Sequence, residues 1–284
     1  MLKPVLPSAQ VFIPDGAPWE QATARITHLA VAAHADDVEL MAWHGIQRCL
    51  TNESMGFAAV IVTDGRGSPR SGAYAQFTSQ QMRDVRLQEQ KRAAQLGRYG
   101  LLVWLDHESA SIKTPHAPQL QEDLRRLFQV IRPRLVYTHN LVDKHDTHVA
   151  VATHLIRALR SASHQPERVL GCEVWRGLDW LTDEDKVLLD VSGQDDRMME
   201  LMRVFDSQIS GGKRYDLAAA GRKRSNATFL ESHAVDQASA VEYAMDLTPL
   251  VRDSTLELDA WTEGFIQRFS RDVAERLRRF IPGT

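Results

Sequence analysis

The chain has 284 residues, of which 43% are hydrophobic and 25% charged, and its formal net charge at pH 7 is -3. This composition is ordinary for a globular protein and excludes a disordered or fibrous chain, while the small negative charge provides no basic field for nucleic acid or an anionic membrane. No apolar stretch of about 20 residues is present, so no membrane span is expected. Both cysteines, Cys49 and Cys172, lie in apolar stretches and predict no disulfide framework, which favours a cytoplasmic protein with a small-molecule partner.

The first part of the chain alternates between strand-like and helix-like patterns. After an irregular lead-in of 24 residues, a buried strand is predicted at residues 28–33 (HLAVAA), and the pattern becomes helical from Asp36. The next strand begins at Phe57 and runs into the loop DGRGSPRSG. A long amphipathic helix follows and ends at Gly97.

The same unit then repeats. A third strand (LLVWLD) is followed by a helix over residues 118–131, and a fourth strand (RLVYTHN) leads through LVDKHDTH into the helix VAVATHLIRAL. Strands that alternate with helices are typical of a sheet covered on both faces. We therefore predict an α/β fold with a Rossmann-like, mostly parallel sheet and helices on both faces.

The pattern is less regular beyond about residue 165. It contains two strand-like runs (VLGCEVW and KVLLDVS), a helix (DDRMMELMRVF), a polar basic stretch (GGKRYDLAAAGRKRSN) and a last helix from near Asp259. We expect a single domain over residues 1–284. Its core would cover about residues 25–190, and residues 191–284 would form an extension that packs on the core and shapes the rim of the site.

Two polar clusters follow predicted strands. His34, Asp36 and Asp37 come after the first strand, and His145 and His148 come after the fourth. Ligands of an open α/β sheet bind at the carboxyl ends of its strands. A catalytic zinc site needs three protein ligands and one open position, and imidazole with carboxylate suits zinc or ferrous iron. Together the two clusters predict one metal site with three ligands.

A structural interpretation of some of these residues stays open. Asp36 followed by Glu39 has the spacing of a capping box, so Asp36 could be only a helix cap. Asp146 or Thr147 could cap the later helix in the same way. Capping does not account for His34.

Basic residues near the predicted site are a weaker signal. Arg66 and Arg70 lie in the loop after the second strand, where an arginine can hold a phosphate, carboxylate or hydroxyl of a substrate. We take Arg66 as the candidate substrate-binding residue, and a solvated turn is the alternative. The short runs GGKR and GRKR are typical of solvated surface.

Four segments carry a resemblance to a known family. AHADDVEL, TDGRGS, EQKRAAQLG and HNLVDKHDTHVAVA resemble the ordered motifs of the PIG-L/LmbE-like zinc-dependent N-acetylglucosaminyl deacetylases, over roughly residues 28–160. The resemblance implies a Rossmann-like hydrolase that removes an acetyl group from an N-acetylated amino sugar or a related small N-acyl compound. It implies Zn²⁺ as the cofactor, or another divalent metal such as Fe²⁺.

The resemblance also implies a role for each residue of the two clusters. His34, Asp37 and His148 would hold the metal, and His145 would stabilise the oxyanion. A metal-bound water would attack the amide carbonyl, with Asp36 as the general base that passes the proton to the leaving amine.

The chain departs from the family pattern at several places. Met41–Gly45 stands where the family has a Gly-rich turn, and Thr147 stands where the family usually has an Asp. The family usually has an acidic residue after the third strand, and the segment LDHESASIK has no clear match to it. Two other functions therefore stay open: a catalytically silent α/β ligand-binding protein, and a ferrous-iron oxygenase that uses the same ligands. No glycine fingerprint follows the first strand, so no nucleotide cofactor is expected. A homo-oligomer also stays open.

Overall fold

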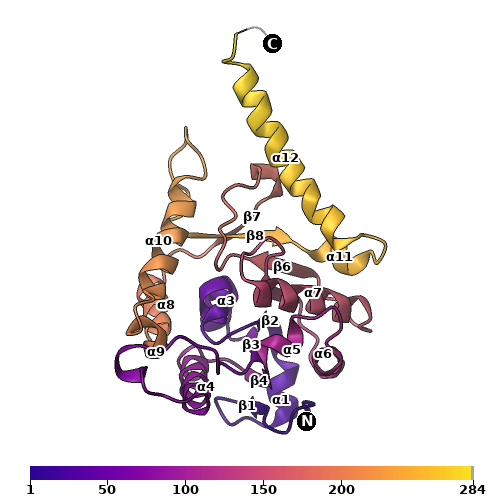
Figure 1. The fold of residues 1–284 in the computed structure, drawn as a ribbon, viewed down its shortest axis with the longest axis vertical. Helices are drawn as coiled ribbons and strands as arrows, with labels where there is room; N and C mark the ends of the chain where they lie inside the picture. The colour runs from indigo at the N-terminus through magenta and orange to yellow at the C-terminus, as the bar shows by residue number, and fades with distance from the viewer. Residues whose placement is uncertain (283–284) are drawn as a thin grey trace.

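The computed structural model describes residues 1–282 and contains one eight-stranded sheet, in the order β1-β4-β3-β2-β5-β6-β8-β7 (Figure 1). The strands, in chain order, are β1 Gln10–Phe12, β2 Ile26–Ala32, β3 Gly56–Thr63, β4 Leu101–His107, β5 Leu135–His139, β6 Arg168–Cys172, β7 Val187–Asp190 and β8 Val241–Asp246. Strands β4, β3, β2, β5 and β6 pair in parallel, whereas β1, β8 and β7 pair antiparallel. The predicted mostly parallel sheet is confirmed.

Helices cover both faces of this sheet (Figure 1). They are α1 Trp19–Ala24, α2 Asp37–Met41, α3 Trp43–Thr51, α4 Ser79–Leu96, α5 Ser109–Ile112, α6 Pro118–Val130, α7 Asp146–Arg160, α8 Asp195–Met202, α9 Asp206–Ile209, α10 Tyr215–Thr228, α11 Thr248–Arg252 and α12 Leu258–Arg278. Two single turns of 3-10 helix, Gly72–Tyr74 and Asp183–Asp185, complete the elements.

The two-sided cover explains why the central strands are apolar throughout. All residues of β3 are buried, and successive side chains alternate between two apolar clusters. Ala58 and Val60 belong to the cluster on one face, and Ala59 and Ile61 belong to the cluster on the other. A strand between two layers of helices needs apolar side chains at both odd and even positions.

The strand order fixes where a ligand can bind. From β2 the chain moves outward to β3 and β4, and β5, which pairs with β2 on its other side, continues outward to β6. The direction of winding therefore reverses between β2 and β5. In open α/β sheets the crevice outside the carboxyl ends of the strands at such a point is the usual binding site.

Several boundaries differ from the prediction. The helix expected from Asp36 is two helices, α2 and α3, with a break at Ala42, where φ is -124° and ψ is 27°. The lead-in contains the edge strand β1, whose three residues are too short for a visible period. The basic stretch forms α10, and β8 was not predicted because the buried Glu242 interrupts its apolar pattern.

The C-terminal part of the chain has two different relations to the sheet. Strand β8 lies inside it, between β6 and β7, and helix α10 packs against β8. Helix α12 instead extends away from the sheet and forms the top of the molecule in Figure 1. Within residues 1–282, no helix combines the length and apolar character that crossing a membrane requires.

Candidate metal centre

The turn after β2 has an unusual backbone. Asp36 has a φ of 79°, a left-handed conformation that costs a residue with a Cβ atom about 1 kcal/mol or more. The backbone N–H of Asp36 donates to Oε1 of Gln90 on α4, at 3.2 Å. The turn folds Asp37 back so that its Oδ2 accepts from the backbone N–H of His34 at 2.8 Å. The side chains of His34 and Asp37 consequently meet.

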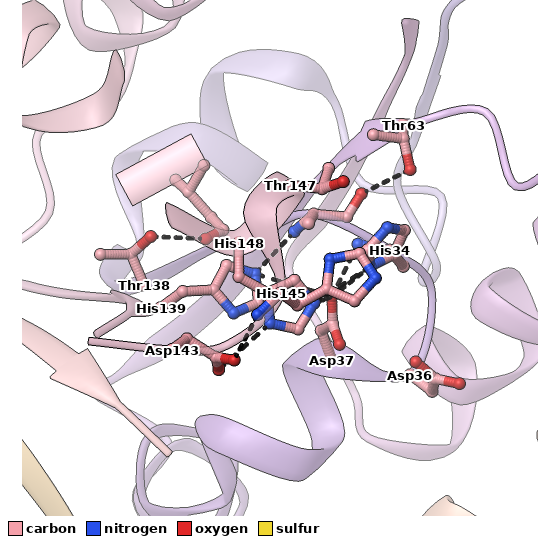
Figure 2. Close-up of polar contacts among 12 residues, drawn as sticks. His34, Asp36, Asp37, Thr63, Thr138, His139, Asp143, His145, Thr147 and His148 are labelled. Atoms are coloured by element: carbon pink, nitrogen blue, oxygen red, sulfur yellow. Dashed lines mark hydrogen bonds and ion pairs between the residues drawn. The ribbon is translucent and has the colours of Figure 1, made fainter. Parts of the chain in front are cut away.

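Three ligand-type atoms converge where the β2 turn meets α7 (Figure 2). Oδ2 of Asp37 lies 3.0 Å from Nδ1 of His34 and 3.2 Å from Nε2 of His148, and the two nitrogens are 3.2 Å apart. A tetrahedral zinc ion with bonds of about 2.0–2.1 Å holds its ligand atoms about 3.3 Å apart. The spacing of the three atoms therefore fits one metal ion. The side chain of His34 is 28% exposed, so one side of the group faces solvent.

The electrostatics of this group favour positive charge. Burial opposes ionisation of Asp37, but His148 and His34 hold the pKa of Asp37 well below its usual value. Burial also opposes a charged His148, yet the carboxylates of Asp37 and Asp143 raise the pKa of His148 to about 9. Two imidazole nitrogens with one carboxylate oxygen suit zinc or ferrous iron. The residues present thus fit a divalent metal both in spacing and in charge.

Asp143 contacts the ring nitrogen of His148 that does not face Asp37. Its Oδ2 lies 3.3 Å from Nδ1 of His148 and accepts from the backbone N–H of Trp175 at 3.2 Å, while its Oδ1 accepts from the backbone N–H of His145 at 3.1 Å. A carboxylate on the second nitrogen of a ligating imidazole fixes the orientation of the ring. Asp146, in contrast, is exposed on the first turn of α7. Asp143 is therefore the carboxylate that supports this side of the site, through His148.

His139, the last residue of β5, lies directly beside the proposed metal ligands. Its ring stacks on His148 with a centroid distance of 3.8 Å, and its Nε2 lies 3.6 Å from Oδ2 of Asp37. The same Nε2 accepts from the backbone N–H of Ala33 at 2.9 Å, so it is already occupied. His139 thus joins the ends of β2 and β5. In the sequence, the position of His139 at the carboxyl end of a predicted strand is the signal that could have placed it at the site.

His145 lies over the opening of the group. Its ring stacks on His148 at 4.5 Å and meets the ring of His34 edge-on at 4.9 Å. Burial lowers the pKa of His145, and its Nδ1 is buried without a hydrogen-bond partner among residues 1–282. The hydrogen-bonding capacity of this nitrogen is therefore not used by the described residues.

Asp36 lies to one side of the converging atoms (Figure 2). Its Oδ2 accepts from the guanidinium of Arg86 at 2.8 Å, and its side chain makes no capping hydrogen bond to α2. Burial raises the pKa of Asp36 to about 6, although the charge of Arg86 lowers it. The side chain of Asp36 is therefore held by α4 and does not act as a helix cap.

Helix α4 supplies the partners of the β2 turn, which no motif in the sequence indicates. Arg86 is 2% exposed and also donates to the carbonyl of Ala35 at 2.5 Å and to Oε2 of Glu89 at 3.0 Å. Gln90, four residues further along α4, donates to Oε1 of Glu39 at 2.8 Å. Positions four apart share one helix face. Nothing in the local sequence says that this face points at the β2 turn.

Arg66 lies on the loop after β3, the strand next to β2. Its guanidinium donates to Oδ2 of Asp64 at 2.7 Å and to Oε1 of Gln80 at 3.0 Å. Within residues 1–282, no hydrogen bond or ion pair joins Arg66 to the two clusters. The structure brings His34, Asp37, His145 and His148 together with Asp36 beside them, whereas the polar contacts of the Arg66 side chain are with Asp64 and Gln80.

The matched segment of a family model covers this whole arrangement. Residues 29–159 match the family described as PIG-L: GlcNAc-PI de-N-acetylase. Over these residues the chain is similar to the PIG-L family. The matched segment runs from β2 to the end of α7, so it includes every residue of both clusters.

Solved structures share the fold of this chain at low sequence identity. An N,N'-diacetylchitobiose deacetylase from Pyrococcus horikoshii has a TM-score of 0.63 at 14% identity, over 87% of this chain and 93% of that one. The A40926 pseudoaglycone deacetylase has a TM-score of 0.58 at 16% identity, over 78% and 97%. A 4-carboxy-2-hydroxymuconate hydratase from Pseudomonas putida has a TM-score of 0.56 at 17% identity, over 82% of this chain and 99% of that one. A comparison with curated proteins found no match.

Proposed function

We propose that this protein is a metal-dependent amide hydrolase that removes the acyl group from a small N-acylated compound. The observation that carries the proposal is the convergence of His34, Asp37 and His148 at mutual distances of 3.0–3.2 Å at the switch point of the sheet. The family description, which names a de-N-acetylase, agrees with it.

His34, Asp37 and His148 would hold the metal, which we propose to be Zn²⁺ or another divalent ion such as Fe²⁺. Such an ion supplies Lewis acidity, because it polarises a carbonyl oxygen and lowers the pKa of water. Asp143 keeps the ring of His148 in place, at 3.3 Å from its Nδ1. The partly exposed side of His34 leaves the approach for a substrate.

Asp36 would move the proton in both halves of the reaction. It takes a proton from the attacking water and returns it to the leaving nitrogen, which departs as a neutral amine. Arg86 donates to Oδ2 of Asp36, and no hydrogen bond to Oδ1 is formed within residues 1–282. We infer that Oδ1 carries the proton while Arg86 and the positive-φ turn fix the carboxylate.

His145 would stabilise the negative charge that develops on the carbonyl oxygen. Its buried Nδ1 has no partner within residues 1–282, and its ring lies against both His34 and His148. A donor positioned for an oxyanion contributes about 3 kcal/mol to lowering the barrier.

The substrate we propose is an N-acetylated amino sugar or a related N-acyl compound. Two of the proteins with this fold are deacetylases, and one of these is named for a diacetylated chitobiose. A third is a hydratase, so the fold alone does not fix the reaction, and the proposal depends on the metal ligands and on Asp36. We further propose one domain over residues 1–284, in which the extension 191–284 completes the sheet through β8, with a cytoplasmic location.

The proposal is tested by measuring metal content and amine release on the same preparation. We expect about one metal ion per chain, hydrolysis of N-acetylated sugars, loss of hydrolysis after chelation and recovery with added zinc. Oxygen consumption with a 2-oxoacid instead of amide hydrolysis would support a ferrous oxygenase. A well-folded, metal-free protein without activity would support a catalytically silent binding protein.

A further inference from the structure

A cavity of about 200 Å³ adjoins the metal centre, between α2, the chain after β6, α10 and β8. Two of its lining residues connect it to the proposed site. Leu40 lies three residues after Asp37 on α2, and Trp175 stacks against His145 with a ring-centroid distance of 6.4 Å. The cavity therefore borders the site.

The charged groups of this cavity already have ion-pair or hydrogen-bond partners within the protein. Lys223 donates to the carbonyl of Leu40 at 2.8 Å and pairs with Glu242 at 3.0 Å. Glu173 accepts from Asn226 at 2.8 Å and from a backbone N–H at 2.6 Å. The remaining lining consists of apolar and aromatic side chains and the mostly apolar chain of Arg222: Leu40, Met41, Val174, Trp175, Tyr215, Ala218, Ala219, Arg222 and Tyr243.

We propose that this cavity binds an apolar chain of the substrate, so that the enzyme prefers an amide with several carbons beyond the reacting group. A dry apolar cavity of about 150 Å³ accepts a molecule of the size of benzene, so this one has room for a chain of about six carbons. This inference rests on the proposed amide hydrolysis. The chain can belong to the acyl group or to the amine side, and the experiment separates the two.

The experiment compares kcat/KM along two series of substrates. One series is glucosamine N-acylated with acetyl, butyryl, hexanoyl and octanoyl groups, and the other is N-acetylglucosamine with methyl, hexyl and octyl glycosides. We expect kcat/KM to rise at least tenfold with chain length in one series. Ala219→Phe fills the cavity from α10 and should reduce the preference for long chains at least tenfold. Ala219→Ser keeps the cavity volume and should retain the preference.

Each result decides between the two proposals. Hydrolysis of the short amides with no dependence on chain length in both series would overturn the subsite and leave the amide hydrolase standing. A preference for long chains that survives in Ala219→Phe would place the chain elsewhere and overturn the subsite. Failure to hydrolyse any amide with metal bound would overturn both.

A second and independent observation concerns α12. Of the 12 exposed large apolar side chains within residues 1–282, half lie on this helix and the two residues after its last turn. These six are Ile266, Phe269, Val273, Leu277, Phe280 and Ile281. The fractions range from 37% for Phe269 to 83% for Phe280. An exposed apolar patch of this kind marks an interaction surface.

The exposed stripe continues the face by which α12 is attached. At its start, Leu258 and Trp261 pack against the core and Phe265 is buried. Further along, the helix extends beyond the sheet (Figure 1). The apolar face is thus longer than the surface that the protein itself offers to it.

The spacing of the stripe points to a second copy of the same helix. Ile266, Phe269, Val273 and Leu277 are separated by 3, 4 and 4 residues, which keeps them on one helix face, and Phe280 follows three residues later, just after the helix. This spacing is symmetric about Val273. An antiparallel twofold pair would therefore match Ile266 with Phe280, Phe269 with Leu277 and Val273 with itself, as an isologous interface requires.

The charges agree with this pairing. Asp272 and Arg276, which pair within the helix at 3.0 Å, lie along the same edge of the stripe. The antiparallel arrangement brings each of them beside the opposite charge of the second copy. Residues 266–281, which carry the stripe, contain five arginines and two carboxylates, so binding to anionic vesicles is the rival outcome that the test has to measure.

We infer that the protein dimerises through α12 as an antiparallel helix pair centred on Val273. The stripe from Ile266 to Ile281 is about 24 Å long at 1.5 Å per residue, which is a short contact, so we expect a dissociation constant on the order of micromolar.

Sedimentation velocity between 1 and 100 μM tests the dimer. We expect a monomer–dimer equilibrium that Val273→Asp shifts to monomer by at least 30-fold, because it places two carboxylates on the twofold axis. Gln267→Asp, off the stripe on the same helix, should retain the dimer. Val273→Cys should form a disulfide-linked dimer on oxidation, and Gln267→Cys should not. A monomer at every concentration, a dimer unaffected by Val273→Asp, or monomers that bind anionic vesicles through α12 would each overturn the inference.

Discussion

The two halves of the metal centre are built in different ways. On the β2 side, the turn that carries His34, Asp36 and Asp37 is held by Arg86 and Gln90 of α4, about fifty residues away in the sequence. On the β5 side, most of the support is local or comes from stacking. Asp143 lies five residues before His148, and the rings of His139 and His145 stack on that residue.

The difference separates two tasks. The β5 side is a stack of imidazoles that holds one ligand in a fixed orientation. The β2 side keeps a buried carboxylate next to a metal ligand, which requires a positive charge and a backbone conformation that a residue with a Cβ atom rarely adopts. Apart from the three proposed ligands, variants of each side should therefore fail in different ways, the β5 side in metal affinity and the β2 side in proton transfer or in folding.

The largest effect is expected where both sides meet the metal. His148→Ala or His34→Ala should reduce the metal content from about one ion per chain to near zero and abolish amide hydrolysis, because two ligands do not make a stable site. Elemental analysis with an amine-release assay measures both quantities. Full metal occupancy in His148→Ala would mean that another residue is the third ligand.

Asp36→Asn should separate proton transfer from metal binding. We expect its turnover to fall by roughly 100- to 10,000-fold with the metal retained, because an amide cannot carry the proton from water to the leaving nitrogen. Asp37→Asn is the matched variant and should weaken the metal site, with activity partly restored by excess zinc. The reverse pattern of metal loss would exchange the two roles, and full activity in Asp36→Asn would remove the residue from the mechanism.

Arg86→Met should affect folding more than any single change on the β5 side. The variant leaves Asp36 and Glu89 buried without their cation, which typically costs about 3–5 kcal/mol in the free energy of unfolding. Urea unfolding of the metal-free protein measures it. A loss below about 1 kcal/mol would indicate that the buried pair contributes little.

Asp143→Asn should weaken metal binding about 10- to 100-fold, since loss of a carboxylate behind a ligating imidazole usually has this effect. Asp146→Asn, three residues further on and exposed, is the control and should bind metal as the natural protein does. Competition with a zinc chelator gives the two affinities. Equal affinities would remove Asp143 from the support of His148.

The smallest effect is expected for Arg66→Ala. We propose that Arg66 contributes to substrate binding from the β3 loop, so its loss should raise KM a few-fold with little change in turnover, as loss of uniform binding does. Its contacts with Asp64 and Gln80 hold it away from the metal ligands, and the metal content should not change. Identical kinetics would mean that the loop is a solvated turn.

The sequence determined the parts of this protein that depend on local pattern. The apolar runs at residues 28–33 and 57–62 predicted buried parallel strands, because a strand between two helix layers cannot alternate polar and apolar residues. His34 and Asp37 follow the first of these strands and His148 follows the fourth predicted strand, and these positions predicted that the three side chains would meet. Their atoms do converge within 3.2 Å, whereas the roles assigned to them stay predictions.

Only the tertiary structure decided the contacts made across the sheet. Arg86 and Gln90 look like ordinary polar positions of an amphipathic helix, and their contact with the β2 turn depends on how α4 packs. In the sequence, Glu242 interrupts an apolar pattern. It is nevertheless buried in β8, because Lys223 of α10 pairs with it there. A buried charge needs a partner, and that partner can lie anywhere in the chain, so no local pattern reveals it.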